Sequence, residues 1–466
     1  MKNKFKTKNY LNISERKAVL KIADILGVFL GLFFVSYKFQ NSYSLFYNEN
    51  SVRWITIFLV YFMLFGNIFE IYNLKISSSR YAILRSLSIT TLATLIFYIL
   101  TPFITPVLPS DRIVLVYMYV SIIVPVIFFR FLYIQFIFTP KFFKRIIIIG
   151  GSKEVREILK IIKKKYFQLN VVAYVSDRKA KNDENRLFLD TKSADIIELV
   201  ENQSIDEIIV SPSSLDEDEY KKINNQLIYL FEHGINIKSI ENLYEEITLC
   251  VAKENLNEEF FKNISFSQNH ENSFYLFVGR FFDILIGSIG LMFLLIVSPL
   301  VILGNLLGNR GPLFYTQERV GKRGENFKIV KFRSMVVNAE KNGAVWAQKN
   351  DNRITSFGKF LRKSRLDEIP QFWNILIGQM SLIGPRPERP EFVEELKKEI
   401  PFYAIRHVIR PGLTGWAQVM FPYANTPEEQ EIKLRYDLYY IKSRGVYMDF
   451  KIFIKTISTV VYFKGQ

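Results

Sequence analysis

Residues 281–308 read FFDILIGSIGLMFLLIVSPLVILGNLLG, an apolar run long enough to cross a lipid bilayer. Ser298 and Pro299 interrupt this run. Proline removes a backbone donor and kinks a helix, and the serine hydroxyl can bond a freed carbonyl. The run therefore predicts either a kinked helix that crosses the membrane or a re-entrant helix, at about residues 279–308, that enters the bilayer and bends back.

The charges that follow the run favour the re-entrant helix. A crossing would export residues 309–466, whereas lysine and arginine near an apolar segment tend to remain in the cytoplasm. We therefore expect residues 271–466 to form a mainly α domain on the cytoplasmic face, with Arg280 near the start of its re-entrant helix. The basic residues that support this topology are Lys322, Arg323, Lys328, Lys331 and Arg333.

Four further apolar stretches precede this domain, at about residues 20–37, 53–73, 82–104 and 112–138. Each has about the length of a membrane span, so residues 1–140 are predicted to form a four-helix transmembrane bundle. We expect both ends of the bundle to face the cytoplasm, and we expect Arg130, inside the fourth stretch, to reach toward the cytoplasmic surface. The charges that set this orientation are Lys2, Lys4, Lys6, Lys8, Arg16, Lys17, Lys21, Lys75, Arg80, Arg85, Lys141, Lys144 and Arg145.

Residues 141–270 change to short β-rich runs separated by charged amphipathic helices, which is typical of an α/β fold. The first predicted strand, RIIIIGG, ends at Gly150 and Gly151 and leads into a helix, as the phosphate-binding turn of a Rossmann unit does. Ser152 and Val155, however, stand where a GxGxxG motif has its other glycines. The segment is therefore either a dinucleotide site or, as we favour, a Rossmann-like domain with a degenerate nucleotide fold.

Composition narrows the possible partners. The chain has 466 residues, of which 49% are hydrophobic, and a formal net charge of +16. Such a charge suits nucleic acid, an anionic membrane or phosphorylated substrates. The basic clusters flank membrane segments, so we expect membrane lipid as a partner and no nucleic acid. The single cysteine, Cys250, excludes an internal disulfide and a Cys-rich zinc site.

The adjacent carboxylates Asp367 and Glu368 are the strongest chemical signal. Pro370 follows two residues later and indicates the first turn of a helix, which places Asp367 at or near the N-cap. Free amides and the helix dipole would stabilise a carboxylate there and also attract a phosphate. Asp367 could then be a nucleophile and Glu368 a ligand of Mg²⁺. The same spacing equally fits a capping aspartate followed by a glutamate that only complements the dipole.

Basic residues recur beside glycines and prolines between Gly311 and Arg386. Arginine presents a planar fork that matches phosphate oxygens, and lysine supplies a mobile charge, so such a stretch suits a diphosphate. A basic surface that faces anionic lipid is the alternative interpretation.

Residues from about Gly279 to Gly465 resemble the catalytic domain of the bacterial sugar transferases, which are monotopic polyprenyl-phosphate hexose-1-phosphate transferases. The resemblance rests on RFFD, the Ser298-Pro299 pair, GPLFYTQERVG, KFRSM, FGKFLRKSRLDEIPQFWN, MSLIGPRP, RPGLTGWAQV and YDLYYIKSR. The N-terminal spans and the α/β segment resemble the long form of the family, which initiates exopolysaccharide, capsule or O-antigen assembly. Many members read S-L-D-E-L-P where this chain has Arg365-Leu366-Asp367-Glu368-Ile369-Pro370, and the variation leaves both carboxylates and the proline in place.

The resemblance implies a two-step reaction. Asp367 would attack the β-phosphate of a UDP-sugar, release UMP and form a covalent aspartyl-phosphosugar intermediate, which undecaprenyl phosphate would resolve. Glu368 would hold Mg²⁺, and Arg362 and Arg386 would bind phosphate or the nucleotide, with Lys331 and Arg333 in the same cleft. It also implies a bacterial inner-membrane location, a re-entrant helix marked by Arg280, Ser298 and Pro299, and a possible homodimer.

Two other functions fit parts of the chain. A nucleotide-sensing membrane scaffold would explain residues 1–270 but not the carboxylate pair. A flippase-like transporter is disfavoured, because the predicted spans have few charges and no paired broken helices.

Overall fold

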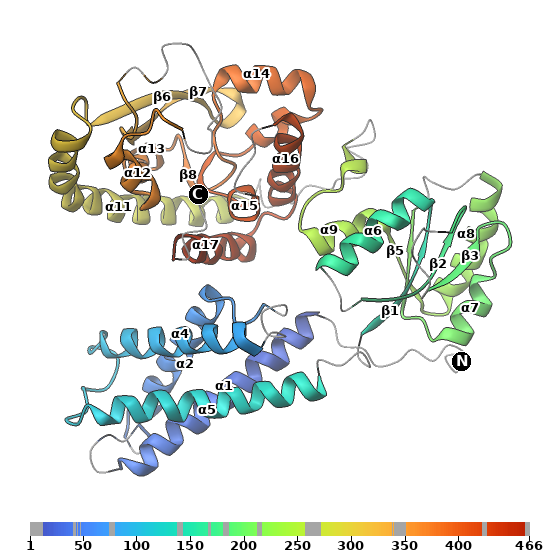
Figure 1. Cartoon of the computed structure of the whole chain (residues 1–466), viewed down its shortest axis with the longest axis horizontal. Coiled ribbons are helices and arrows are strands. Elements are labelled where there is room, and N and C mark those ends of the chain that lie inside the picture. The colour runs from blue at the N-terminus through green and yellow to red at the C-terminus, as the bar shows by residue number, and fades with distance from the viewer. Residues whose placement is uncertain are drawn as a thin grey trace. The chain divides into compact units, whose positions relative to one another are not determined.

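The computed structural model describes residues 13–40, 43, 45–46, 48–73, 80–137, 143–165, 169–179, 186–211, 217–256, 272–337, 339, 351–421 and 426–461. The chain forms two compact units, Met1–Leu243 and Tyr244–Gln466 (Figure 1). The residues from 244 to 256, which the sequence grouped with the α/β segment, thus belong to the second unit. Of the charges expected to orient the spans, Lys2, Lys4, Lys6, Lys8, Lys75 and Lys141 lie outside the described residues, whereas Arg16, Lys17 and Lys21 lie on α1.

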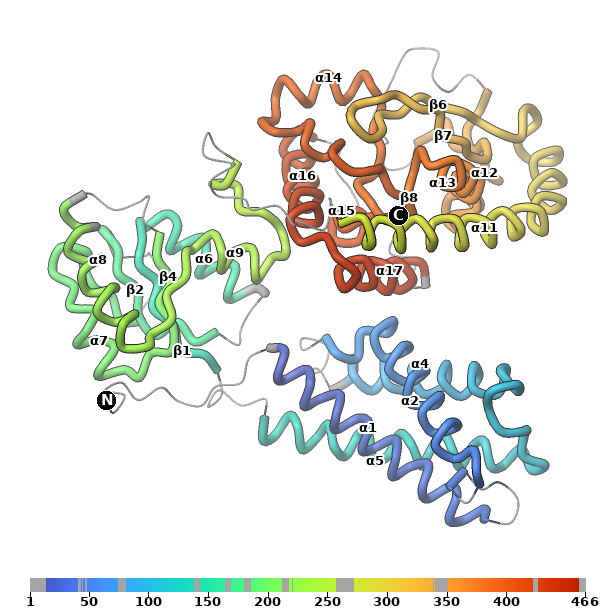
Figure 2. Tube along the Cα trace, turned by 180° about the vertical axis from the view of Figure 1, so that it is seen from behind, coloured from blue at the N-terminus to red at the C-terminus, as the bar shows by residue number. Residues whose placement is uncertain are grey.

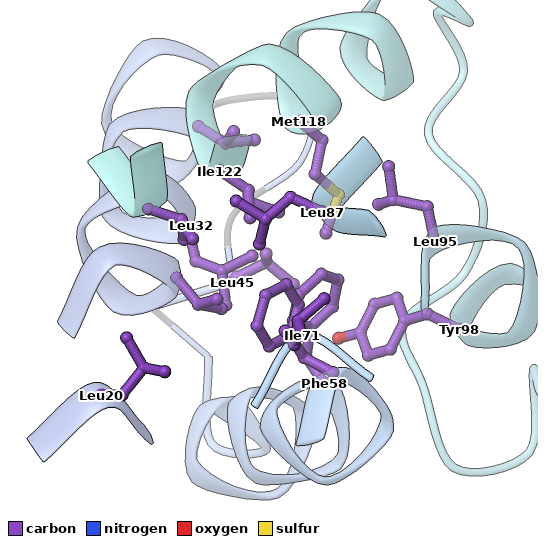
Figure 3. Packing of buried hydrophobic residues seen from close by; sticks show 14 of the residues in the cluster. Leu20, Leu32, Leu45, Phe58, Ile71, Leu87, Leu95, Tyr98, Met118 and Ile122 are labelled. Atoms are coloured by element: carbon purple, nitrogen blue, oxygen red, sulfur yellow. The ribbon is translucent and has the colours of Figure 1, made fainter. Parts of the chain in front are cut away.

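Four N-terminal helices are long and apolar enough to cross a membrane. Buried residues from these helices and their connections point toward one another and form a shared core, which includes Leu32, Phe58, Leu87 and Met118 (Figure 3). The chain is a membrane protein with an α/β domain. The helices are α1 (Ile13–Lys38), α2 (Ser51–Ile68), α4 (Arg80–Ile99) and α5 (Ile113–Phe136).

The sequence suggested that Arg130 reaches the surface of this bundle. Arg130 is instead buried inside it and is 3% exposed. Its Nε donates to Asp24 Oδ1 over 2.9 Å and its Nη2 to Asp24 Oδ2 over 2.5 Å. A third bond, from Nη1, reaches the carbonyl of Ile71 over 2.8 Å. A partner on α1 therefore makes burial possible, since a forked guanidinium pairs both carboxylate oxygens at once. The sequence of the fourth apolar stretch alone could not show that Asp24, on another helix, is the partner of Arg130.

Asp24→Asn is expected to destabilise the bundle strongly. Removing one charge of a buried pair leaves the other uncompensated and costs about 3–5 kcal/mol. The melting temperature in detergent should fall well below that of the wild type. Asp111→Asn makes the same chemical change at an exposed carboxylate and serves as the control. Equal melting temperatures for the two variants would contradict a stabilising role for the pair.

The α/β part is a parallel five-stranded sheet in the order β3-β2-β1-β4-β5. Helices α7 and α8 cover one face, and α6 and α9 the other (Figures 1 and 2). This is the expected Rossmann-like topology. The elements are β1 (Lys144–Ile149), α6 (Ser152–Lys165), β2 (Leu169–Ser176), β3 (Leu187–Asp190), α7 (Ile196–Gln203), β4 (Glu207–Val210), α8 (Glu217–Glu232), β5 (Asn236–Ser239) and α9 (Ile240–Thr248).

A carboxylate of the chain itself lies at the turn after β1. The backbone N–H of Ser152, at the start of α6, donates to Asp177 Oδ1 over 2.9 Å. In a nucleotide-binding Rossmann unit the amides of this turn face a pyrophosphate. The contact favours the structural interpretation of this turn over the dinucleotide site.

The second unit is mostly helical, as expected, and it contains two small sheets: the antiparallel pair β6-β7 and the parallel pair β8-β9. Its elements are η3 (Lys253–Asn255), α11 (Ser273–Gly308), β6 (Phe314–Val320), η5 (Lys322–Gly324), β7 (Asn326–Phe332), α12 (Ser356–Lys363), η6 (Leu366–Gln371), α13 (Phe372–Leu376), β8 (Ser381–Ile383), α14 (Pro390–Glu399), η7 (Tyr403–His407), β9 (Gly412–Thr414), α15 (Trp416–Met420), α16 (Pro427–Lys442) and α17 (Val446–Val461).

Helix α11 contacts this unit at both of its ends. Near its start, Asp283 Oδ1 accepts from the Ser381 hydroxyl over 3.0 Å and from the Leu382 amide over 2.8 Å. Near its end, Asn305 Nδ2 donates to the carbonyl of Gly311 over 2.8 Å. Both ends of this apolar helix are therefore held by the same folded unit, and both views show the helix bent between them (Figures 1 and 2).

Pro299 bends this helix without ending it, because α11 continues from Ser273 to Gly308. The Ser298 hydroxyl donates to the carbonyl of Leu294 over 2.6 Å. The carbonyl that loses its partner to Pro299 is that of Leu295, four residues before the proline. The serine thus bonds the carbonyl next to the freed one, a detail that the spacing alone did not predict.

Candidate active site

Asp367 and Glu368 lie in the 3₁₀ turn η6, which runs directly into α13. The N-cap of this turn is Arg365, in a left-handed conformation with φ 56°, so Asp367 is in the first turn rather than at the cap. Ser364, just before Arg365, is the C-cap of α12. The turn starts earlier than the proline rule suggested, and Pro370 lies inside it, where it has no N–H to donate to the residue three positions earlier.

Asn374 ties the carboxylate turn to strand β7. Its side chain accepts from the Val330 amide over 3.1 Å and donates to the Lys328 carbonyl over 2.7 Å. Asn374 is 1% exposed, so both bonds are shielded from water. They hold β7, and with it Lys331, beside η6.

The same turn packs directly on α11. The ring of Phe372 lies against Gly290, where an added Cβ would be 2.3 Å from the Phe372 Cδ2. Only glycine allows this close approach of ring and helix. Arg280 reinforces it, because its Nη1 and Nη2 each donate over 2.6 Å to the carbonyls of Ile375 and Leu376 at the end of α13. The apolar helix and the carboxylates therefore form one rigid structure.

Two arginines hold Glu368. Arg386 Nη2 lies 2.9 Å from Glu368 Oε1, and Arg365 Nη1 lies 3.5 Å from Oε2. Both guanidinium groups remain about one-third exposed. They neutralise the carboxylate and still face solvent, where a phosphate could reach them.

The two neighbouring carboxyls have opposite pKa shifts. Burial raises the pKa of Asp367, and the charge of Glu368 raises it further, against the opposing effect of Lys331, Arg362 and Arg386. Burial would also raise the pKa of Glu368, but Arg386, Lys331 and Arg365 outweigh it and hold that pKa below its usual range. Glu368 is therefore a fixed anion, while Asp367 is a carboxylate in a poorly solvated site that titrates closer to neutrality.

Lys331 belongs to the same cluster. Burial and the nearby charge of Arg386 lower the pKa of Lys331 to about 8. Crowded cations of this kind gain stability when an anion binds among them. The site is thus built to accept the negative charge of a phosphate or diphosphate.

A buried ionic network fixes the loop that carries Arg386. Arg406 Nη2 donates to the Arg386 carbonyl over 2.9 Å and lies 2.8 Å from Asp437 Oδ2. Lys433 Nζ is 2.5 Å from Glu388 Oε1, and Arg319 donates to the Pro387 carbonyl over 3.2 Å. Flanking prolines restrict the same loop. Arg386 is therefore positioned by charges on α16, η7 and β6 before any ligand binds.

The two adjacent carboxylates of the site could also serve as ligands of Mg²⁺. Among the described residues, no group of three or more His, Cys, Asp and Glu side chains is placed around a metal position. Mg²⁺ commonly uses only one or two carboxylates and takes its other ligands from water and substrate phosphates. Asp367 and Glu368 provide two adjacent carboxylates, so the residues fit an ion that arrives with a diphosphate.

Comparisons with known proteins identify the family. The bacterial sugar transferase family model matches residues 274–463. A putative undecaprenyl-phosphate N-acetylgalactosaminyl 1-phosphate transferase of Bacillus subtilis strain 168 is 49% identical over 142 residues, which are 30% of this chain and 79% of that protein. The chain belongs to the bacterial sugar transferase family. The predicted resemblance is thereby confirmed.

Two further relatives differ in how much of this bacterial sugar transferase aligns with them. The UDP-N-acetylgalactosamine-undecaprenyl-phosphate N-acetylgalactosaminephosphotransferase of Aeromonas hydrophila is 46% identical over 40% of this chain and 44% of its own length, less than half of that relative. The UDP-glucose:undecaprenyl-phosphate glucose-1-phosphate transferase of Klebsiella pneumoniae is 28% identical over 97% of this chain and 96% of its own. A CoA-binding domain model matches residues 67–240.

The structure of this transferase brings together most of the predicted site residues. Lys331, Arg362 and Arg386 all act electrostatically on Asp367. Arg333 does not join them: it is 6% exposed, and its guanidinium donates to the carbonyls of Pro312 and Asn309 over 2.8 and 3.1 Å. Its position two residues after Lys331 suggested a shared cleft, but β7 ends at Phe332, so Arg333 lies beyond the strand. Arg333 holds the end of α11.

Sequence reasoning missed the residues that position the site. The quoted motif segments contain Arg319, Asn374 and Asp437 but not Glu388 or Arg406. A motif also does not say which of its polar residues meet a partner that lies 31 to 68 positions away. The missed residues are Arg319, Asn374, Glu388, Arg406 and Asp437.

Proposed function

We propose that this protein transfers a sugar 1-phosphate from a UDP-sugar to undecaprenyl phosphate. A carboxylate oxygen of Asp367 attacks the β-phosphorus, the bond between that phosphorus and the bridging oxygen breaks, and UMP leaves. A phosphate oxygen of the lipid then attacks the same phosphorus and releases the Asp367 carboxylate. The product is a sugar linked to the lipid by a diphosphate, the first intermediate of exopolysaccharide, capsule or O-antigen assembly.

The carboxylate pair within its cluster of cations is the observation that carries this proposal. A direct transfer between two anions is difficult, and a covalent intermediate divides it into two easier steps. Burial makes Asp367 a weakly solvated nucleophile, and Lys331, Arg362 and Arg386 supply positive charge where the phosphate oxygens would lie. The names of the relatives, which are undecaprenyl-phosphate sugar-phosphate transferases, support the same substrates.

Glu368 is proposed to hold Mg²⁺ together with the diphosphate. The ion would neutralise charge on the phosphate oxygens during transfer. Glu368 also orients Arg386. Glu368→Gln should shift the Mg²⁺ dependence of turnover to higher concentrations, and an unchanged Mg²⁺ titration would refute the ligand role.

Helix α11 is proposed to be re-entrant, with the whole second unit on the cytoplasmic face of the inner membrane. Its 36 residues would extend about 54 Å if straight, well beyond the roughly 30 Å hydrocarbon core. Both ends contact the same folded unit, and exposed apolar residues cover the middle of the helix, where Leu295 is 73% and Ile296 72% exposed. These observations suit a bent helix that dips into one leaflet.

Cysteine labelling tests this topology. In a Cys250→Ser background, cysteines replacing Ser14, at the start of α1, and Glu399, on α14, should both react only after the membrane is permeabilised. Labelling of the Glu399 position alone from outside the cell would show that α11 crosses the membrane.

The function itself is tested by UMP release. Purified wild-type protein should release UMP from one member of a panel of UDP-glucose, UDP-galactose and UDP-N-acetylgalactosamine when Mg²⁺ and undecaprenyl phosphate are present. Release of UDP in place of UMP would indicate a different bond cleavage and would overturn the proposal.

A further inference from the structure

A cavity of about 1520 Å³ opens beside the carboxylates within the second unit. Glu368 and Arg365 line one part of it, and apolar side chains of α11 and α17, among them Phe282 and Phe453, line another. Several apolar side chains of this lining are exposed: Phe277 is 69%, Phe450 54% and Phe453 44% exposed. One continuous space thus joins the reactive carboxylates to a wall that suits hydrocarbon.

A second group of cations lines this cavity, apart from the group around Asp367. Three of these cations, Lys322, Arg323 and Arg410, are exposed. Burial by its surroundings and the charges of Arg410 and Arg323 lower the pKa of Lys322. Mutual repulsion among these cations would be relieved by an anion with several oxygens, such as a phosphate monoester.

We infer that this cavity binds the lipid acceptor, with its phosphate at Lys322, Arg323 and Arg410 and its hydrocarbon chain between α11 and α17. The inference rests on the proposed function. A lipid phosphate needs a cationic pocket for its head and an apolar channel for its chain, and it must reach the phosphorus held at Asp367. This cavity combines all three features, because Glu368 lines it as well.

The two groups of cations then have separate tasks. Lys331, Arg362 and Arg386 surround the donor phosphates at Asp367, while Lys322 and Arg410 hold the acceptor. This division allows a sharp test, since donor and acceptor act in different half-reactions. Changes at Lys322 and Arg410 should weaken the second half-reaction and leave the first intact.

The experiment measures both half-reactions for Lys322→Ala and Arg410→Ala. In single-turnover conditions without lipid, each variant should release UMP at the wild-type rate and with the wild-type dependence on UDP-sugar concentration. With lipid, the KM for undecaprenyl phosphate should rise about tenfold for each variant, since one charge-assisted bond is lost. Lys398→Ala removes an exposed lysine of α14 that does not line the cavity, and it should leave both measurements unchanged.

Direct binding makes the test independent of turnover. Undecaprenyl phosphate, but neither undecaprenol nor inorganic phosphate, should displace a fluorescent prenyl phosphate from wild-type protein in nanodiscs. Phe453→Ala should weaken this binding as well. Displacement by inorganic phosphate alone would show a simple anion site and overturn the inference, as would an altered UDP-sugar dependence in the Lys322 and Arg410 variants.

A third measurement, binding to vesicles of anionic phospholipid, distinguishes a site for the lipid acceptor from a surface that only contacts the membrane. If Lys322→Ala and Arg410→Ala weaken binding only to vesicles of anionic phospholipid and leave the acceptor KM unchanged, the cations are a membrane-contact surface and the inference is wrong. Failure of the proposed function would look different, because wild-type protein would then release no UMP with any UDP-sugar.

Discussion

Asp367→Asn should abolish turnover, with a fall in kcat of at least about 10⁴-fold, the scale seen when a covalent nucleophile is removed. The amide keeps the size of the side chain but cannot form the acyl phosphate. UMP release in the absence of lipid should disappear, and mass spectrometry should find no increase corresponding to a sugar phosphate on the protein. In the wild type this adduct should be present on the peptide that contains Asp367.

Two comparisons make this result specific. Glu395→Gln removes one negative charge, as Asp367→Asn does, but from an exposed side chain on α14. This variant should retain full activity. Asp367→Asn should also keep its melting temperature or gain stability, because it replaces a buried carboxyl whose ionised form is poorly solvated. Near wild-type UMP release by Asp367→Asn would exclude the covalent mechanism.

The sequence predicted the parts of this site that depend on neighbours along the chain. Asp367, Glu368 and Pro370 are close in sequence, so their place at a helix start could be inferred, although the 3₁₀ geometry and the cap at Arg365 could not. Apolar runs likewise predicted α11 and the N-terminal helices, since length and hydropathy decide whether a segment can span a membrane.

Pairings between distant residues could not be predicted in this way. Asp24 and Arg130 are 106 positions apart, and each taken alone is a charge in an apolar helix. The same holds for Arg406 and Asp437, whose pairing depends on how η7 packs on α16. Lys331 and Arg333 are two positions apart, so strand alternation would place them on one face. Nothing in the sequence signalled that Arg333 instead bonds the end of α11.

Arg386→Gln should lower kcat/KM for the UDP-sugar by about 10²–10³-fold, the cost of removing one charged group that stabilises a transition state. Arg386 is bound to Glu368 and lies among the cations around Asp367, so its loss removes positive charge from both carboxylates. The network of Arg406 and Asp437 holds the Arg386 backbone and not its guanidinium, so the loop should remain folded.

The pH profile distinguishes this electrostatic role from a structural one. Asp367 must be ionised to attack, so activity is lost as the pH falls through its raised pKa, at a higher pH than the usual value of about 3.9. A positive charge favours the ionised forms of both carboxyls, so removing Arg386 raises the apparent pKa values of the pair. The acid limb of kcat/KM should therefore move to higher pH in Arg386→Gln and return toward the wild-type position in Arg386→Lys.

Arg389→Gln is the matched control for this shift. Arg389 is the next arginine of the same loop, and it pairs with the exposed Glu391 over 3.4 Å rather than with Glu368. Its replacement should leave the acid limb in place, since surface ion pairs contribute little. An unchanged acid limb in Arg386→Gln would mean that Arg386 does not set the charge of the carboxylates, and its contribution would then be limited to binding the substrate.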